Sequence, residues 1–115
     1  MIRFEQDELE IMKKSGQVVG HVGNNYISEI YQLDRTRTVE EFEKQIKNIA
    51  LRAISIGKKE EESVYTKPLA DLMEVVNKYK DNHDEIKDIV LVYATYYLGA
   101  IKHSKKQGGI ENEGN

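Results

Sequence analysis

Lysines and arginines in the first half of the chain are the residues best suited to chemistry on another molecule. Both neutralise phosphates, and the arginine guanidinium also forms paired hydrogen bonds with phosphate oxygens. Arg35-x-Arg37, on a short connection, is the strongest candidate for gripping phosphate. The candidate nucleic-acid-binding residues are Lys13, Lys14, Arg35, Arg37, Lys44, Lys47 and Arg52. Solubility and favourable interaction with helix dipoles remain an alternative role for most of them.

Residues that catalyse reactions or bind metals form no recognisable pattern. The sequence contains no cysteine, so it offers no thiol nucleophile, and its three histidines have no paired spacing. His83 with Asp84 and Asp88 comes nearest to a metal site, but Asp88 is more simply a surface charge. No glycine-rich phosphate loop with a following Lys-Ser/Thr is present. We therefore expect a protein that is not an enzyme, with no catalytic residue, no metal and no cofactor.

Three glycines interrupt the first amphipathic segment at positions 16, 20 and 23. Each costs about 0.5–1 kcal/mol relative to alanine inside a helix, so another interaction must offset that cost. Because Gly16, Gly20 and Gly23 share nearly one helix face, they allow a second backbone to approach closely. The neighbour is either another helix of the same domain or, in a second interpretation, another chain or a phosphate backbone. We expect the three glycines to be packing residues, including in contacts between subunits.

The elements that must position these residues are helices, because apolar residues recur at three- and four-residue steps. With 115 residues the chain has room for one core only. We predict an all-α fold, a single bundle of four or five helices in up-and-down order. The expected helices cover about 4–31, 38–57, from 66 to about 79, and 83–104. The helical domain is expected to span 1–106, and the Gly-, Asn- and Glu-rich segment 107–115 to be a disordered tail.

Local signals place several helix ends. Thr38 with Glu41 three residues later predicts a capping box, and Gly57 is placed to end that helix. Pro68 is expected in the first turn of the third helix. The fourth helix is apolar nearly all round, which predicts that it is the central, most buried one.

Charge and hydropathy limit the setting in which the protein works. The net charge is −3, which argues against a free-standing nucleic-acid binder because such proteins are usually basic. No apolar run approaches the length of a membrane-spanning helix, and the charged start lacks a signal-peptide core. We therefore expect a cytoplasmic protein without membrane contact.

The order of these segments resembles the small subunit of CRISPR–Cas interference complexes of the Cascade type, like the helical C-terminal domain of type I large subunits. The resemblance is carried by the glycine-rich KKSGQVVGHVGNNY, the Thr-Val-Glu-Glu-Phe helix start, Tyr65-x-x-Pro68-Leu69 and the closing VYATYYLGAIKHSKK. These features cover about residues 5–106. The closing aromatic helix is also similar to the last helix of type III small subunits.

The resemblance implies a non-catalytic subunit that stacks along a ribonucleoprotein and stabilises the guide–target duplex or the displaced strand. Its partners would be other interference subunits, copies of itself, and guide RNA with target or displaced DNA, contacted through phosphates. The net acidity departs from this expectation, and the acidic segments could instead face basic neighbouring subunits. The alternative function is a stand-alone helical protein–protein interaction module, a homodimer without nucleic acid.

Overall fold

Apolar residues spaced three and four apart form one side of each helix, and these sides meet in a shared core. The computed structural model describes residues 2–57 and 62–114, with side chains described for 2–57 and 63–104. Its helices are α1 (Gln6–Gly23), α2 (Ile27–Asp34), α3 (Val39–Ile56), α4 (Glu62–Lys78), the 3-10 turn η2 (Lys80–Asn82) and α5 (His83–Gly114). The described part of the chain contains no strand, so the predicted all-α bundle is confirmed.

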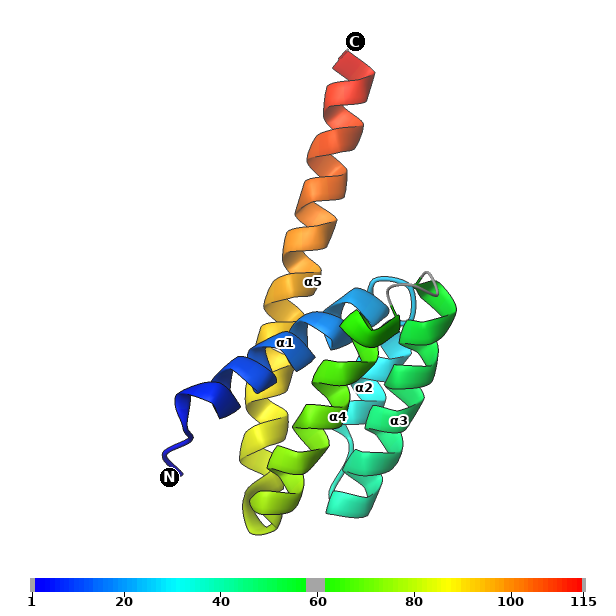
Figure 1. The fold of residues 1–115 in the computed structure, drawn as a ribbon. Helices are drawn as coiled ribbons and strands as arrows, with labels where there is room; N and C mark the ends of the chain where they lie inside the picture. The colour runs from blue at the N-terminus through cyan, green and yellow to red at the C-terminus, as the bar shows by residue number, and fades with distance from the viewer. Residues whose placement is uncertain (1, 58–61, 115) are drawn as a thin grey trace.

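The helices α2 to α5 alternate in direction, while α1 crosses them obliquely (Figure 1). The main partner of α1 is α5, with α4 second, and α3 packs on α4 and α2. α5 continues past the bundle as a single helix toward the C-terminus (Figure 1). All five helices contribute to one core, whose largest fully buried members are Phe42, Met12, Leu33, Ile46, Ile49, Leu69, Leu72, Ile86, Val19, Val22, Val76 and Val90.

The first predicted helix is broken in the structure. Instead of one helix over 4–31, α1 ends at Gly23 and α2 begins at Ile27. The residue before α2, Tyr26, has φ −134° and ψ 64°, which is not helical, so the chain changes direction there. The break lets α2 fold back and bury Ile30 and Leu33, although Leu33 was expected in a connection. The free energy of burying these side chains outweighs helix continuity.

The start of α3 follows its sequence signal, with one difference. The Thr38 hydroxyl oxygen accepts the Glu41 backbone N–H at 3.1 Å, as the capping box predicts. The Glu41 carboxylate, however, accepts the backbone N–H of Arg37 at 2.7 Å, one residue before the cap. At the other end Gly57 follows α3 as predicted, and its N–H donates to the Ala53 carbonyl at 2.9 Å.

α4 begins earlier than the sequence predicts. It starts at Glu62 rather than near Thr66, so Pro68 lies inside the helix and not in its first turn. The N–H that proline lacks would have donated to the carbonyl of Val64, an exposed residue. The carbonyl of Pro68 accepts the Ser15 hydroxyl at 2.9 Å, which ties this turn to α1. Most of the predicted polar loop at 58–63 lies outside the described residues.

α5 is buried on one side only, so the prediction of a fully central helix is wrong. Ile86, Val90, Ala94 and Leu98 form its buried side. Tyr96 is 79% exposed, because α1 and α2 cover the other side of the helix and leave this one open. The helix runs to Gly114, past the predicted domain end at 106; the disorder predicted for 107–115 stays a prediction.

Candidate nucleic-acid interface

The connection between α2 and α3, residues 34–38, carries the two arginines that the sequence singles out. Arg35 and Arg37 are exposed, while Thr36 between them is 6% exposed. The Thr36 hydroxyl donates to the carbonyl of Leu33 at 2.7 Å, which turns its side chain back into the end of α2. The connection therefore presents two guanidinium groups on either side of a buried anchor.

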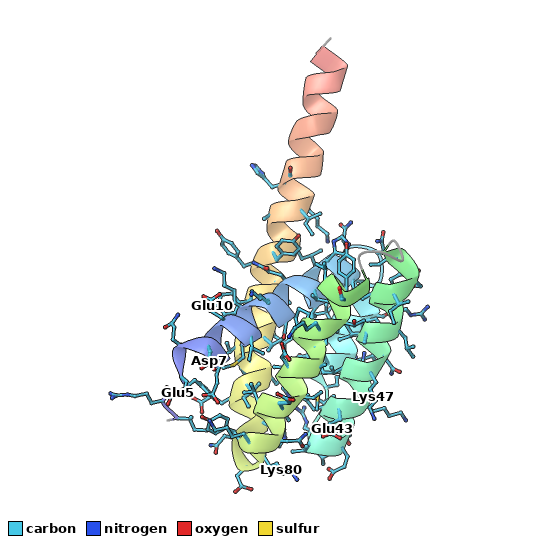
Figure 2. The ribbon with its side chains drawn as sticks, in the orientation of Figure 1. Glu5, Asp7, Glu10, Glu43, Lys47 and Lys80 are labelled. Atoms are coloured by element: carbon cyan, nitrogen blue, oxygen red, sulfur yellow. The ribbon has the colours of Figure 1, made fainter. Side chains whose placement is uncertain are left out.

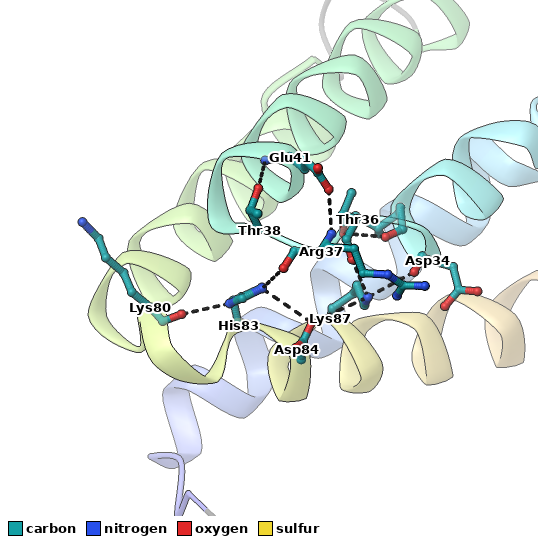
Figure 3. A network of polar contacts seen from close by, with 10 residues as sticks. Asp34, Thr36, Arg37, Thr38, Glu41, Lys80, His83, Asp84 and Lys87 are labelled. Carbon is teal, nitrogen blue, oxygen red and sulfur yellow. Dashed lines mark hydrogen bonds and ion pairs between the residues drawn. The ribbon is translucent and has the colours of Figure 1, made fainter.

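A buried lysine of α5 holds this connection from below. The Lys87 ammonium group donates to the carbonyl of Asp34 at 3.1 Å and to that of Thr36 at 2.8 Å (Figure 3). Lys87 is 4% exposed, and its ion pair with the exposed carboxylate of Asp84 is long, at 3.8 Å. Carbonyls at a helix C-terminus carry partial negative charge, so a cation stabilises the end of α2. The sequence gave no sign of this role, because Lys87 reads as one more surface charge in an apolar helix.

His83 holds the same connection from the start of α5. Its Nδ1 lies 2.9 Å from the Lys80 carbonyl oxygen and its Nε2 lies 3.1 Å from the Arg37 carbonyl oxygen (Figure 3). Both neighbours are acceptors, so only the doubly protonated imidazolium can donate to both. The hydrogen bond to Lys80 raises the pKa of His83 most, and the Arg37 carbonyl and Asp84 add to this, against the opposing effects of burial and Lys87.

The start of α3 completes the support. The Glu41 carboxylate accepts the Arg37 N–H, so the residue that carries one guanidinium is held at its N–H by α3 and at its carbonyl by α5. Four polar side chains, from Thr38, Glu41, His83 and Lys87, thus converge on five residues of backbone (Figure 3). The two arginines stand on backbone that is fixed before any ligand binds.

A shallow hollow of about 380 Å³ lies beside the connection, lined in part by Arg35 and Lys44. Two carboxylates also line it, but both already have partners. Glu29 accepts from Gln45 at 2.8 Å and pairs with Arg52 at 3.7 Å. Within the described residues Arg35 and Lys44 take part in no ion pair, so their charge is available to an anion.

The other predicted cations divide into three groups. Lys47 is exposed on α3, on the far side of the bundle from the acidic start of α1 that carries Glu5, Asp7 and Glu10 (Figure 2). Lys13 and Lys14 are exposed on α1, where Lys14 lines a separate groove of about 810 Å³ between α1 and α4. Arg52 is paired with Glu29 and lies 4.8 Å from the centre of the Tyr26 ring. The structure therefore brings together Arg35, Arg37 and Lys44, but not the whole predicted set.

The three glycines pack inside the chain. A Cβ at Gly16 would overlap Tyr93, and one at Gly20 would come 2.6 Å from the Ala94 carbonyl oxygen, so both bring α1 against α5. A Cβ at Gly23 would overlap Ile30 of α2. This is the first of the two interpretations, a neighbouring helix of the same domain. A subunit contact on this face would require α5 to move away.

Sequence reasoning missed a second polar cluster, around Glu8. This carboxylate is 5% exposed and accepts the Glu5 N–H at 2.8 Å, the Lys78 ammonium at 2.9 Å and the Tyr79 hydroxyl at 2.8 Å. Burial alone would raise the pKa of Glu8, but these hydrogen bonds together outweigh it and the pKa is lowered. Glu8 looks like one of several acids in a first turn, and only the spatial arrangement distinguishes it.

The described residues bring no three His, Asp or Glu side chains together as a metal-binding group. None of the described helices has both the length and the apolar character that crossing a membrane requires. No family model, curated protein or solved structure matches this chain. The resemblance to CRISPR interference subunits therefore stays a prediction.

Proposed function

We propose that this chain is a non-catalytic subunit of an RNA-guided interference ribonucleoprotein and contacts a nucleic-acid backbone through Arg35 and Arg37. The observation that carries the proposal is the fixed connection 34–38, which presents two exposed arginines without ion pairs. A site fixed before binding loses less conformational entropy when the ligand arrives, so its affinity is higher. Two guanidinium groups two residues apart suit successive phosphates of one strand better than a single small anion.

The choice of partner rests on the resemblance of the sequence to CRISPR small subunits. In such an assembly sequence is read by guide pairing, and protein contacts go to the backbone of guide, target or displaced strand. The local positive charge is compatible with a net charge of −3, because the acidic start of α1 lies on the other side of the bundle (Figure 2). The acidic side would then face neighbouring protein subunits, including copies of this chain.

The test is the binding of fluorescent single-stranded RNA and DNA oligonucleotides, followed by anisotropy over a range of salt concentrations. We expect the double variant Arg35→Gln/Arg37→Gln to bind about tenfold more weakly and to lower the salt slope by about 1.4, as for two lost phosphate contacts on a single strand. The matched control is Lys13→Gln/Lys14→Gln, which removes the same charge from α1 and should change affinity less.

Equal losses in the two double variants would mean that binding follows net charge and not this site. If the wild-type chain binds neither oligonucleotide, nor co-purifies with a guide RNA and interference subunits, the proposal fails. The alternative, a helical interaction module without nucleic acid, would then be the better description, and the exposed apolar residues of α5 favour it specifically.

A further inference from the structure

One side of α5 faces away from the bundle and is covered by nothing in the described structure. We define this outer face by the exposed residues Asp88, Val92, Thr95, Tyr96, Gly99 and His103. Val92 is 68% and Tyr96 is 79% exposed, and their spacing places them on one stripe of the helix. A Cβ at Gly99 would meet no atom within 4 Å, so the stripe contains an open notch beside a large aromatic ring.

We propose that a second copy of the chain covers the outer face, with the two α5 helices antiparallel about a two-fold axis near Thr95 and Tyr96. A two-fold interface must be complementary to itself, and this stripe holds both a protruding part and a notch. In this register Val92 of one copy lies opposite Gly99 of the other, and the two Tyr96 rings lie side by side at the axis. A glycine at a helix crossing lets the two backbones approach closely, as Gly16 and Gly20 already do between α1 and α5.

Charge on the outer face selects the antiparallel direction. Acids occupy the first part of α5, with Asp88 on the face itself, whereas Lys102 and His103 lie in the later part. The antiparallel register places Asp88 opposite His103 and close to Lys102 of the second copy. A parallel pair would instead place Asp88 against Asp88, and like charges across an interface are unfavourable.

The bundle leaves room for this pair. The core side of α5 carries Val90 and Ala94, opposite the outer face, so each bundle would lie on the outside of the helix pair. α5 also extends past its own bundle (Figure 1), and from Gly99 to Ser104 every residue except Ile101 is exposed. A helical segment without tertiary contacts is only marginally stable in water. The second copy would supply such contacts, since its α5 would run along this extension.

Sedimentation equilibrium of the full chain, from low micromolar to millimolar concentration, tests the proposal. We expect a concentration-dependent dimer whose dissociation constant rises about tenfold or more in Gly99→Leu, which fills the notch. The same substitution removes a helix-interior glycine, so the unfolding temperature of the dilute monomer should stay equal or rise. Tyr96→Glu should weaken the dimer as well. Leu51→Glu, at a 66% exposed position on α3, is the control and should leave it unchanged.

Direction is tested by cross-linking, because the natural chain has no cysteine. Chains carrying Asp88→Cys and chains carrying His103→Cys are mixed and treated with a short bis-maleimide. Mixed dimers should exceed like-with-like dimers; the reverse would overturn the antiparallel arrangement. A wild-type chain that stays monomeric at every concentration, or a Gly99→Leu variant that dimerises as tightly as wild type, would overturn the second copy as occupant. The dimer should persist in Arg35→Gln/Arg37→Gln, because the inference is independent of nucleic-acid binding.

Discussion

At the scale of single residues, the structure separates charges that are engaged within the chain from charges that face outward. Lys87 and Arg37 are both cations by sequence. Lys87 is buried against two backbone carbonyls, whereas the Arg37 guanidinium is exposed on a backbone that other side chains hold. Their difference comes from position alone, since Lys87 faces the α2–α3 connection from α5. Residue type identifies a possible phosphate contact, but exposure and ion pairing decide whether the charge is available.

His83 gives a prediction at this scale. Its raised pKa means that the folded state binds the proton more tightly than the unfolded state does. Its contribution to stability is therefore complete below the ordinary value of 6.5 and is lost as pH rises through the raised value. We expect His83→Gln to lower the free energy of unfolding by about 1–2 kcal/mol at mildly acidic pH and by less above neutrality.

Urea unfolding of both proteins across this pH range measures the difference. Titration of the His83 ring resonances by NMR provides a direct reading of its pKa. A His83 that titrates below its ordinary value would contradict the two-acceptor arrangement, as would a stability difference that does not change with pH.

At the scale of elements, the close crossing of α1 and α5 explains why glycines are placed inside a helix. Gly16 and Gly99 both lie in helix interiors, but a Cβ at Gly16 would meet α5 and a Cβ at Gly99 would meet nothing. The same glycine-to-alanine change should therefore have opposite effects at the two positions. The sequence shows two glycines in helices and cannot distinguish these cases.

We expect Gly16→Ala to destabilise the fold by about 1–3 kcal/mol, because the new Cβ forces the backbones apart. Gly99→Ala should instead stabilise it by about 0.5–1 kcal/mol through helix propensity alone. Thermal and urea unfolding at low protein concentration measure both. Equal effects of the two substitutions would mean that α1 and α5 do not cross closely at Gly16.

At the scale of the whole molecule, Glu8 joins the beginning of α1 to the end of α4. Its partners Lys78 and Tyr79 lie about seventy positions away in sequence and hold α1 across the bundle. The ring of Phe4 also packs edge-on against Tyr79, with ring centres 5.1 Å apart. The cluster therefore closes the N-terminal part of the fold, and its loss should affect global stability.

We expect Glu8→Gln to lower the free energy of unfolding by about 1–3 kcal/mol at neutral pH, because an amide cannot accept from three donors as a carboxylate does. The lowered pKa of Glu8 makes this contribution full above the ordinary value of 4.5, and it is lost as pH falls through the lowered value. Wild type and variant should thus converge in acid. Glu10→Gln, an exposed acid of the same helix, serves as the control in urea unfolding and should change little.

The sequence by itself determined the helical class, the position of α3 and the candidate arginines, because these depend on local periodicity, a capping threonine and residue chemistry. Thr38, Gly57 and the core side of α3 could all be placed from neighbours a few positions away. The break after Gly23 and the one-sided burial of α5 were decided only by tertiary structure, because each depends on which distant surface is available to cover an apolar side chain. The same holds at the candidate interface: Arg35 and Arg37 could be identified from type and spacing. Their support by Lys87 and His83 spans about fifty residues of sequence, and such contacts exist only once the helices have packed.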